Sequence, residues 1–129
     1  MNIFFDCDYT IIAMNGNLRP GVSELFRSLK SDGHNIYVWS GRGIRWYEVR
    51  KHGLDSYVTD CFHKPLFDYR RRMKILNVTV EPDIVIDDYP DIVSTLGGVR
   101  VTPYLYERTH DMEMEKLYPI ISALSAKIL

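Results

Sequence analysis

The first apolar run of the sequence ends on two aspartates that are separated by one residue. In the segment IFFDCDYT, residues 3–5 predict a buried strand, and Asp6 and Asp8 follow where that strand ends. Side chains two positions apart in a strand point to the same side of the sheet. Because two like charges held that close repel, the pattern predicts either positive charge beside them or a proton on one of them.

Polar side chains also follow three later apolar runs. Ser40 ends the run IYVWS, and Lys64 comes two residues after an apolar run that ends at residue 62. Asp87 and Asp88 follow the run IVI. Ligands of open α/β sheets bind beyond the carboxyl ends of the strands, so these side chains are expected to meet there. Helix capping and turn chemistry alone do not account for four such positions in succession.

The elements that must position these residues alternate along the chain. The apolar patterns predict strands over residues 3–5, 35–39, 57–62, 83–86 and 99–102. They predict helices opened at 20–21 and stopped at 32–33, over 44–52, 67–76 and 90–96, and from 111 to the end. Asn15-Gly16 indicates a tight turn in a short hairpin over 9–18. This alternation favours an α/β fold, a parallel sheet covered by helices on both faces.

The composition indicates one globular domain over residues 1–129. Of the 129 residues, 46% are apolar and 26% are charged, which is ordinary for a folded domain. No apolar stretch approaches the roughly 18 to 20 residues that span a bilayer, and the first residues lack the features of a signal peptide. We therefore expect a cytoplasmic protein without a membrane partner, in which Cys7 and Cys61 are free thiols.

The charge is unevenly distributed along the chain. Residues 42–74 hold nine basic and four acidic residues, which gives this segment +5 and the remainder −6. Such an asymmetry would suit an anionic substrate, and the alternative is two solvated helix faces. The basic run from Arg70 to Lys74 would suit a nucleic-acid backbone by charge, although no aromatic residues are interleaved with it.

The motifs resemble those of the haloacid dehalogenase superfamily, most of whose members are phosphatases and phosphotransferases. FFDCDYT is similar to the first motif of that family, IYVWSG to the second, HKP to the third and IVIDDYPD to the fourth, so the resemblance spans nearly the whole chain. It implies a three-layer Rossmann-like fold whose five-stranded parallel sheet has the order 5-4-1-2-3. The first strand would then lie between the fourth and the second.

The resemblance implies a role for each aspartate of the first motif. Asp6 would attack phosphorus and form an aspartyl-phosphate, which divides one difficult step into two easier ones. Asp8 would act as general acid and base, protonating the departing oxygen and later accepting a proton from water. Because a halide leaves without a proton, the presence of Asp8 favours a phosphatase over a dehalogenase.

A magnesium ion is the cofactor that the resemblance implies. Its ligands would be the Asp6 carboxylate, the backbone carbonyl of Asp8 and an acid of the fourth motif, and oxygen ligands are those that Mg²⁺ prefers. We favour Asp88 as the direct ligand and Asp87 as a ligand through water. The pair also fits a helix N-cap before Pro90, and both readings can hold together.

The second and third motifs would bind the phosphoryl group. Ser40 and the backbone N–H of Gly41 would donate hydrogen bonds to its oxygens, and Lys64 would offer a point charge to the same group and to Asp6. Arg42 would either contact the substrate phosphate or remain a solvated surface charge.

The spacing between motifs leaves no room for a cap domain. Only 29 residues separate Thr10 from Ser40, and 22 separate Lys64 from Asp87. Capless members of the family tend to act on large substrates, so the resemblance implies one here. Specificity would then come from the flap at 9–18, nearby loops, the C-terminal segment or an oligomeric partner. DYT, IDDYP and SGR resemble parts of protein-tyrosine-type, RNA polymerase C-terminal-domain and polynucleotide phosphatases. A phosphoprotein and a nucleic-acid 3′-phosphate are therefore substrate alternatives to a small metabolite.

Two readings without catalysis remain open. Receiver-like phosphate-binding domains also place acids, Ser or Thr, and Lys at strand ends, but they carry an adjacent acidic pair at the first strand. An inactive relative that binds partners through the open face would have no physical reason to keep Asp8 and Lys64 together.

Overall fold

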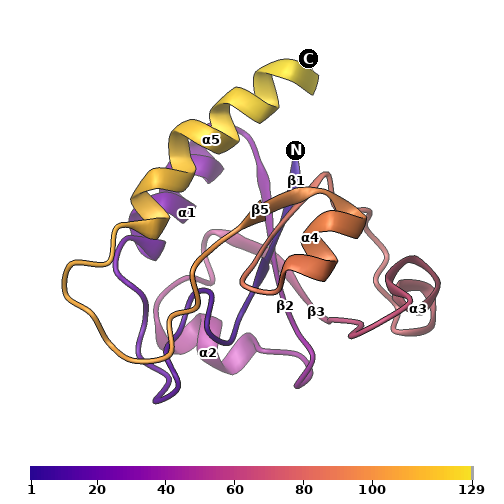
Figure 1. Ribbon diagram of the computed structural model, residues 1–129, viewed down its shortest axis with the longest axis horizontal. Coiled ribbons are helices and arrows are strands. Elements are labelled where there is room, and N and C mark those ends of the chain that lie inside the picture. The colour runs from indigo at the N-terminus through magenta and orange to yellow at the C-terminus, as the bar shows by residue number, and fades with distance from the viewer. Residues whose placement is uncertain (129) are drawn as a thin grey trace.

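The computed structural model describes residues 1–128, which form an α/β fold around one five-stranded parallel sheet (Figure 1). The strands are β1 (Asn2–Asp6), β2 (Asn35–Ser40), β3 (Val58–His63), β4 (Ile84–Asp87) and β5 (Gly98–Arg100). The helices are α1 (Val22–Ser31), α2 (Trp46–Lys51), α3 (Tyr69–Ile75), α4 (Pro90–Leu96) and α5 (Glu113–Ile128).

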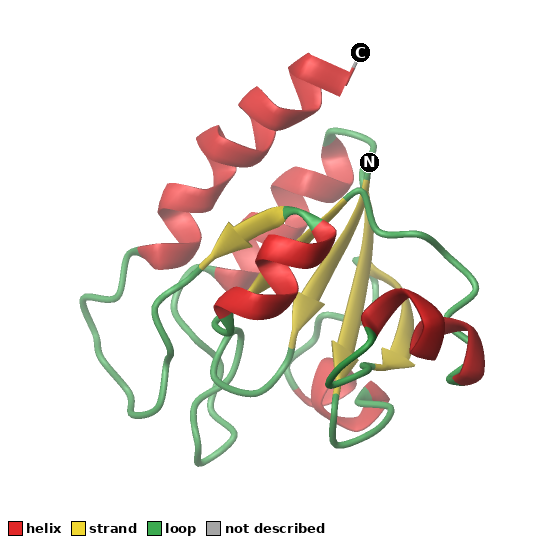
Figure 2. Ribbon diagram, turned by 45° about the vertical axis from the view of Figure 1, so that its right-hand side comes forward, coloured by secondary structure: helices red, strands yellow, loops and turns green. Residues whose placement is uncertain are grey.

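The strand order is β3-β2-β1-β4-β5, which places β1 at the centre of the sheet between β2 and β4. Read from the β5 edge, the same order is 5-4-1-2-3. All four strand pairings are parallel, so the carboxyl ends of the strands lie at one edge, toward the lower side of Figure 2. The loops that follow the strands therefore gather where the polar motifs were expected.

Two separate apolar cores lie on the two faces of the sheet. Ile3 and Phe5 of β1 belong to one core, together with buried residues of α1, α2 and α5. Phe4 belongs to the other, which is built with residues of α3 and α4. Alternate side chains of a strand point to opposite faces, so β1 contributes to both cores and is apolar at its three middle positions. The result is a three-layer arrangement of helices, sheet and helices.

The register of the strands brings the four motifs together. Asp6 of β1 is paired with Trp39, the residue before Ser40, and Phe5 is paired with Ile86, the residue before Asp87. Ser40 in turn is paired with His63, the residue before Lys64. The paired residues Ser40 and His63 mark one row across the sheet. Each aspartate, serine and lysine of the four motifs lies in this row or one residue from it along its own segment.

Some element bounds differ from those that the patterns predict. The helix expected over 44–52 spans only Trp46–Lys51, because Arg45, the residue before it, has a non-helical φ of −106° and ψ of 35°. The hairpin expected over 9–18 is a flap with a single antiparallel bridge between Ile12 and Leu18, turned at Gly16. Both cysteines are buried free thiols, as expected. None of the described helices is long and apolar enough to span a membrane.

Candidate functional site

A lysine and two buried aspartates form the centre of the site, at the carboxyl ends of β1, β3 and β4. The Lys64 ammonium lies 2.9 Å from Asp6 Oδ1 and 3.1 Å from Asp87 Oδ2. Asp6 is 5% exposed and Asp87 is fully buried. The Thr10 hydroxyl donates to the second Asp6 oxygen at 3.1 Å. Each buried carboxylate therefore has a hydrogen-bond donor, as buried charges require.

Asp6, Asp87 and Asp88 can together hold a metal ion. One carboxylate oxygen from each lies within 4.8 Å of the others. Oxygens that share an octahedral Mg²⁺ ion at about 2.1 Å are roughly 3 to 4 Å apart, so small side-chain movements suffice. The donor set consists of oxygen only, which matches a hard divalent cation. The Asp8 side chain does not belong to this group.

The electrostatics of the three central residues are linked. Burial and the charge of Asp87 raise the pKa of Asp6, against the attraction of Lys64. Burial also raises the pKa of Asp87, again against Lys64. Burial acts to lower the pKa of Lys64, but the two carboxylates outweigh it and raise that pKa. The single charge of Lys64 does not balance the two carboxylates of Asp6 and Asp87, and a divalent cation would supply the missing positive charge.

Asp8 has a cationic partner of its own. Its carboxylate forms an ion pair with Arg45, accepts a hydrogen bond from the Ser40 hydroxyl at 3.1 Å, and lies 3.8 Å from Arg42. Arg45 is further paired with Glu48 at 3.1 Å. The two aspartates of the first motif are therefore neutralised separately, Asp6 by lysine and Asp8 by arginine.

The second motif shapes the loop beside Asp8. The Ser40 hydroxyl accepts a hydrogen bond from the Arg42 backbone N–H at 3.1 Å while it donates to Asp8. The Leu66 side chain lies against Gly41. A Cβ on Gly41 would be only 2.6 Å from a Leu66 methyl group, so this position has no room for a larger residue unless Leu66 moves. The Arg42 side chain is 68% exposed at the rim. It is solvated, as one of the two readings has it, and a contact with the substrate phosphate stays a prediction.

All the residues predicted for the site line one open hollow of about 290 Å³ at the sheet edge. The structure adds Tyr9, Leu66 and Tyr89 to the predicted set. The predicted residues in this hollow are Asp6, Asp8, Ser40, Gly41, Arg42, Lys64, Asp87 and Asp88.

Sequence reasoning missed two residues that hold the site together. Thr10, the last residue of the first motif, donates to Asp6 and lies 3.5 Å from Asp88 Oδ1. Arg45 pairs with Asp8. The signal for a cation beside Asp8 was present in the unbalanced Asp-x-Asp pair, but nothing in the spacing distinguished Arg45 from the other basic residues of the 42–74 segment.

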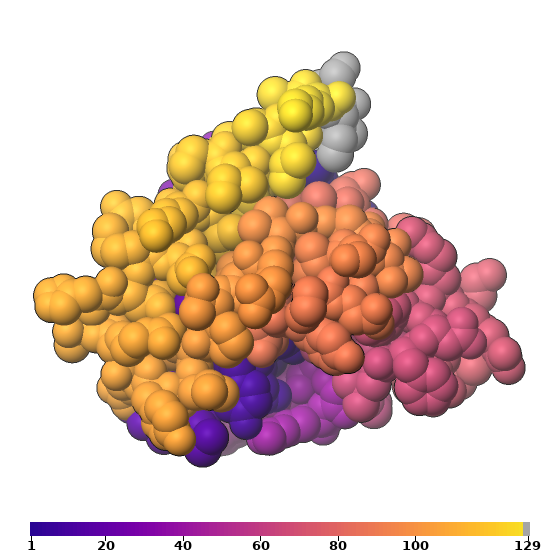
Figure 3. Space-filling model, in the orientation of Figure 1, coloured from indigo at the N-terminus to yellow at the C-terminus, as the bar shows by residue number. Residues whose placement is uncertain are grey.

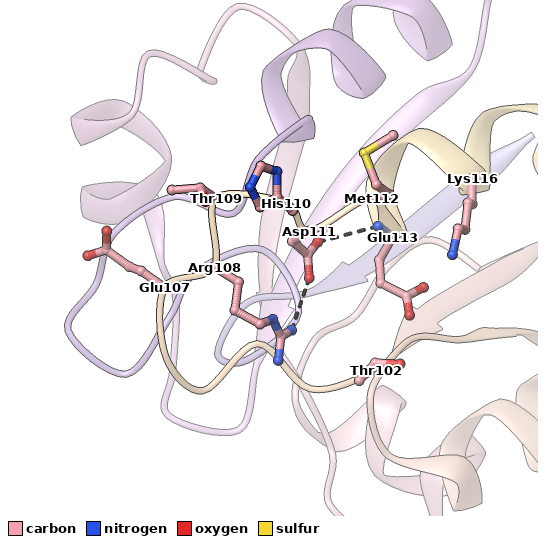
Figure 4. Close-up of a pocket in the computed structure, with 9 residues that line it drawn as sticks. All are labelled: Thr102, Glu107, Arg108, Thr109, His110, Asp111, Met112, Glu113 and Lys116. Atoms are coloured by element: carbon pink, nitrogen blue, oxygen red, sulfur yellow. Dashed lines mark hydrogen bonds and ion pairs between the residues drawn. The ribbon is translucent and has the colours of Figure 1, made fainter.

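A larger hollow, of about 590 Å³, lies between the 102–112 loop and the start of α5 (Figure 4). The Asp111 carboxylate in this hollow already has partners: Arg108 Nη2 lies 2.9 Å from it, and the Glu113 backbone N–H donates a hydrogen bond to it at 3.3 Å. Size alone therefore does not identify the site. The acidic cluster at the ends of β1 and β4 remains the candidate.

No protein-family model, curated protein or solved structure matches this chain. A functional assignment therefore depends on the residues and distances given above.

Proposed function

We propose that the protein is a Mg²⁺-dependent phosphomonoester hydrolase of the haloacid dehalogenase type, without a cap domain. The observation that carries the proposal is the convergence of four separate motifs on one hollow. Lys64 lies within 3.1 Å of both Asp6 and Asp87, and Asp8 lines the same hollow with its own partners. Asp8 follows Asp6 by two residues and has its own cationic partner, Arg45. Neither the fold nor an internal salt-bridge network would need this second aspartate.

The residues present fit the implied cation. Asp6, Asp88 and the Asp8 backbone carbonyl would hold it, with Asp87 acting through water. This division is supported by the contacts of Asp87, whose two oxygens are taken by Lys64 at 3.1 Å and the Tyr89 N–H at 3.0 Å. When bound, Mg²⁺ offsets the repulsion between a carboxylate and a phosphate dianion.

The reaction proceeds in two displacements at phosphorus. An Asp6 oxygen attacks phosphorus, the bond from phosphorus to the ester oxygen breaks, and protonated Asp8 gives its proton to that oxygen. Water then attacks the aspartyl-phosphate and passes a proton to Asp8, while the bond between phosphorus and Asp6 breaks. Inorganic phosphate leaves, and both aspartates return to their starting states.

The other residues position the reacting groups. Lys64 holds Asp6 through a hydrogen bond of 2.9 Å and offers positive charge to the phosphoryl oxygens. Ser40 and Gly41 line the hollow beside it, so the Gly41 N–H and the Ser40 hydroxyl would serve the same oxygens. The cytoplasmic location, a macromolecular substrate and an oligomeric partner stay predictions.

Turnover of p-nitrophenyl phosphate with and without Mg²⁺ tests the proposal. Removing divalent ions with a chelator is expected to lower kcat by about 100-fold or more, and added Mg²⁺ should restore it, because the central carboxylates are under-compensated without a cation. Asp88→Asn should need a higher Mg²⁺ concentration for half-maximal activity. Asp83→Asn, at the other end of β4, is the matched control. Turnover that is indifferent to chelation would contradict the metal role.

Arg45→Gln tests the positioning of Asp8. The variant removes the ion pair that orients Asp8, so we expect kcat to fall by about 10- to 100-fold with little change in KM. Arg50→Gln, on α2, is the control. An Arg45 variant with the parental kcat would exclude this role.

A further inference from the structure

The acidic hollow continues into a second, mainly apolar hollow. The second hollow has a volume of about 190 Å³ and lies between the loops that follow β3 and β4. It shares Lys64, Leu66 and Tyr89 with the acidic hollow. The remaining lining residues are Pro65, Tyr69 and Ile92. An apolar space thus begins at the lysine that would bind the phosphate.

The size and chemistry of this hollow suit one aromatic ring. A protein cavity of about 150 Å³ lined by aliphatic and aromatic side chains takes up benzene, so 190 Å³ leaves room for a ring. Tyr69, the buried tyrosine of its lining, donates its hydroxyl hydrogen to Asp91 at 2.8 Å. A long aliphatic chain would exceed the volume.

Two large apolar side chains that line the hollow are exposed. Leu66 is 63% exposed and Tyr89 is 57% exposed. The Leu66 side chain lies beside Gly41, so the apolar wall adjoins the expected phosphate loop. Apolar side chains that flank a charged hollow gain free energy when a ligand removes them from water. A phosphate ester with a ring would cover these two side chains and reach Lys64 at the same time.

Building on the proposed function, we propose that this hollow is the leaving-group subsite and that the substrate class is phosphomonoesters carrying an aromatic group close to the ester oxygen. Leu66 and Tyr89 are then the residues that determine specificity. The subsite supplies binding energy next to the reacting phosphorus, which an open site without a cap otherwise lacks.

The test compares benzyl phosphate with ethyl phosphate in the presence of Mg²⁺. Both release a primary alcohol, so their intrinsic reactivity is similar and the comparison isolates the ring. We expect kcat/KM for benzyl phosphate to be at least about tenfold higher. Leu66→Ala and Tyr89→Ala should each lower this ratio by about threefold or more. Tyr118→Ala, a tyrosine on α5 remote from the site, should preserve the ratio.

The outcomes separate this inference from the proposed function. If both esters are hydrolysed with kcat/KM values within twofold of one another, the aromatic subsite is overturned and the proposed phosphatase activity stands. A high ratio that neither Leu66→Ala nor Tyr89→Ala lowers would also overturn it, whereas a fall in either variant supports it. No hydrolysis of either ester would overturn the proposed function, and this inference with it.

Discussion

Asp6→Asn is expected to lower kcat for p-nitrophenyl phosphate by about 1,000-fold or more. An amide oxygen is a poor nucleophile, so the variant cannot form the covalent intermediate. Asparagine has nearly the same shape; its single oxygen can accept the hydrogen bond from Lys64, while its NH2 group can donate to the Thr10 hydroxyl in place of the bond that Thr10 now donates. The loss would therefore report on chemistry and not on a rearranged site.

The stability of the Asp6 variant provides an internal control. Burial and Asp87 raise the pKa of Asp6, so the native state binds that proton more tightly than the unfolded chain does. Its contribution to stability is present below the unfolded pKa, near 3.8, and is lost as pH rises through the higher folded pKa. In Mg²⁺-free buffer at pH 7, Asp6→Asn should therefore be at least as stable as the parent. Urea unfolding measures this.

Two comparisons complete the design. Asp83→Asn, which changes an aspartate at the amino end of β4, should retain parental turnover. Asp8→Asn should also be severely impaired, but through loss of the acid and base, so its rate with a good leaving group should suffer less than with a poor one. Asp6→Asn protein that is folded and fully active would exclude the assigned nucleophile.

The convergence of the motifs was predictable because it depends on strand ends. Parallel strands align their carboxyl ends, and Asp6, Ser40, Lys64 and Asp87 all follow apolar runs that could be recognised as strands. The predicted bounds of α4, Pro90–Leu96, are those of the structure, because a proline opens this helix and Gly97 follows its last residue. Local chemistry therefore determined both features.

The side-chain partners within the site were less predictable. Thr10 reaches Asp6 because the chain turns directly after β1, with the Thr10 N–H donating to the Cys7 carbonyl at 3.3 Å, and Arg45 reaches Asp8 from the loop after Gly43. Those loops carry no periodic signal, and Gly43 at a φ of 116° redirects the backbone in a way that the apolar pattern does not encode. The shared apolar hollow has the same origin, since it lies between two loops.

The least predictable feature is a buried arginine that joins three segments distant in sequence. Arg19 is 1% exposed, and its Nε and Nη2 lie 2.8 and 3.0 Å from the two oxygens of Asp111. It also donates to the backbone carbonyls of Thr10 at 3.1 Å and Thr102 at 2.8 Å. The flap, the segment after β5 and the start of α5 are thereby tied together. In Figure 3 that C-terminal part of the chain, orange to yellow, covers one side of the visible face.

Breaking this ion pair is expected to cost about 3 to 5 kcal/mol of unfolding free energy. Arg19→Met leaves the Asp111 carboxylate buried without its main partner, and Asp111→Leu leaves the guanidinium unpaired. The double variant should cost less than the sum of the two by about 1 kcal/mol or more, because neither charge is then stranded. Urea unfolding of the four proteins at pH 7 gives these values.

The control and the pH dependence separate this pair from ordinary surface pairs. Arg71 and Asp68 lie 3.7 Å apart but are largely exposed, so Arg71→Met should cost less than about 1 kcal/mol. The pH dependence of stability follows from the pKa of Asp111. Burial acts to raise this pKa, but hydrogen bonds from Arg19 and Arg108 outweigh burial and lower it. The stabilisation is therefore present above the unfolded pKa, near 3.8, and lost as pH falls through the lower folded pKa. Because Arg19 also holds the carbonyl of Thr10, whose hydroxyl contacts Asp6, Arg19→Met should reduce turnover even where the protein is fully folded. Single variants costing under 1 kcal/mol would show that Arg19 does not hold the three segments together.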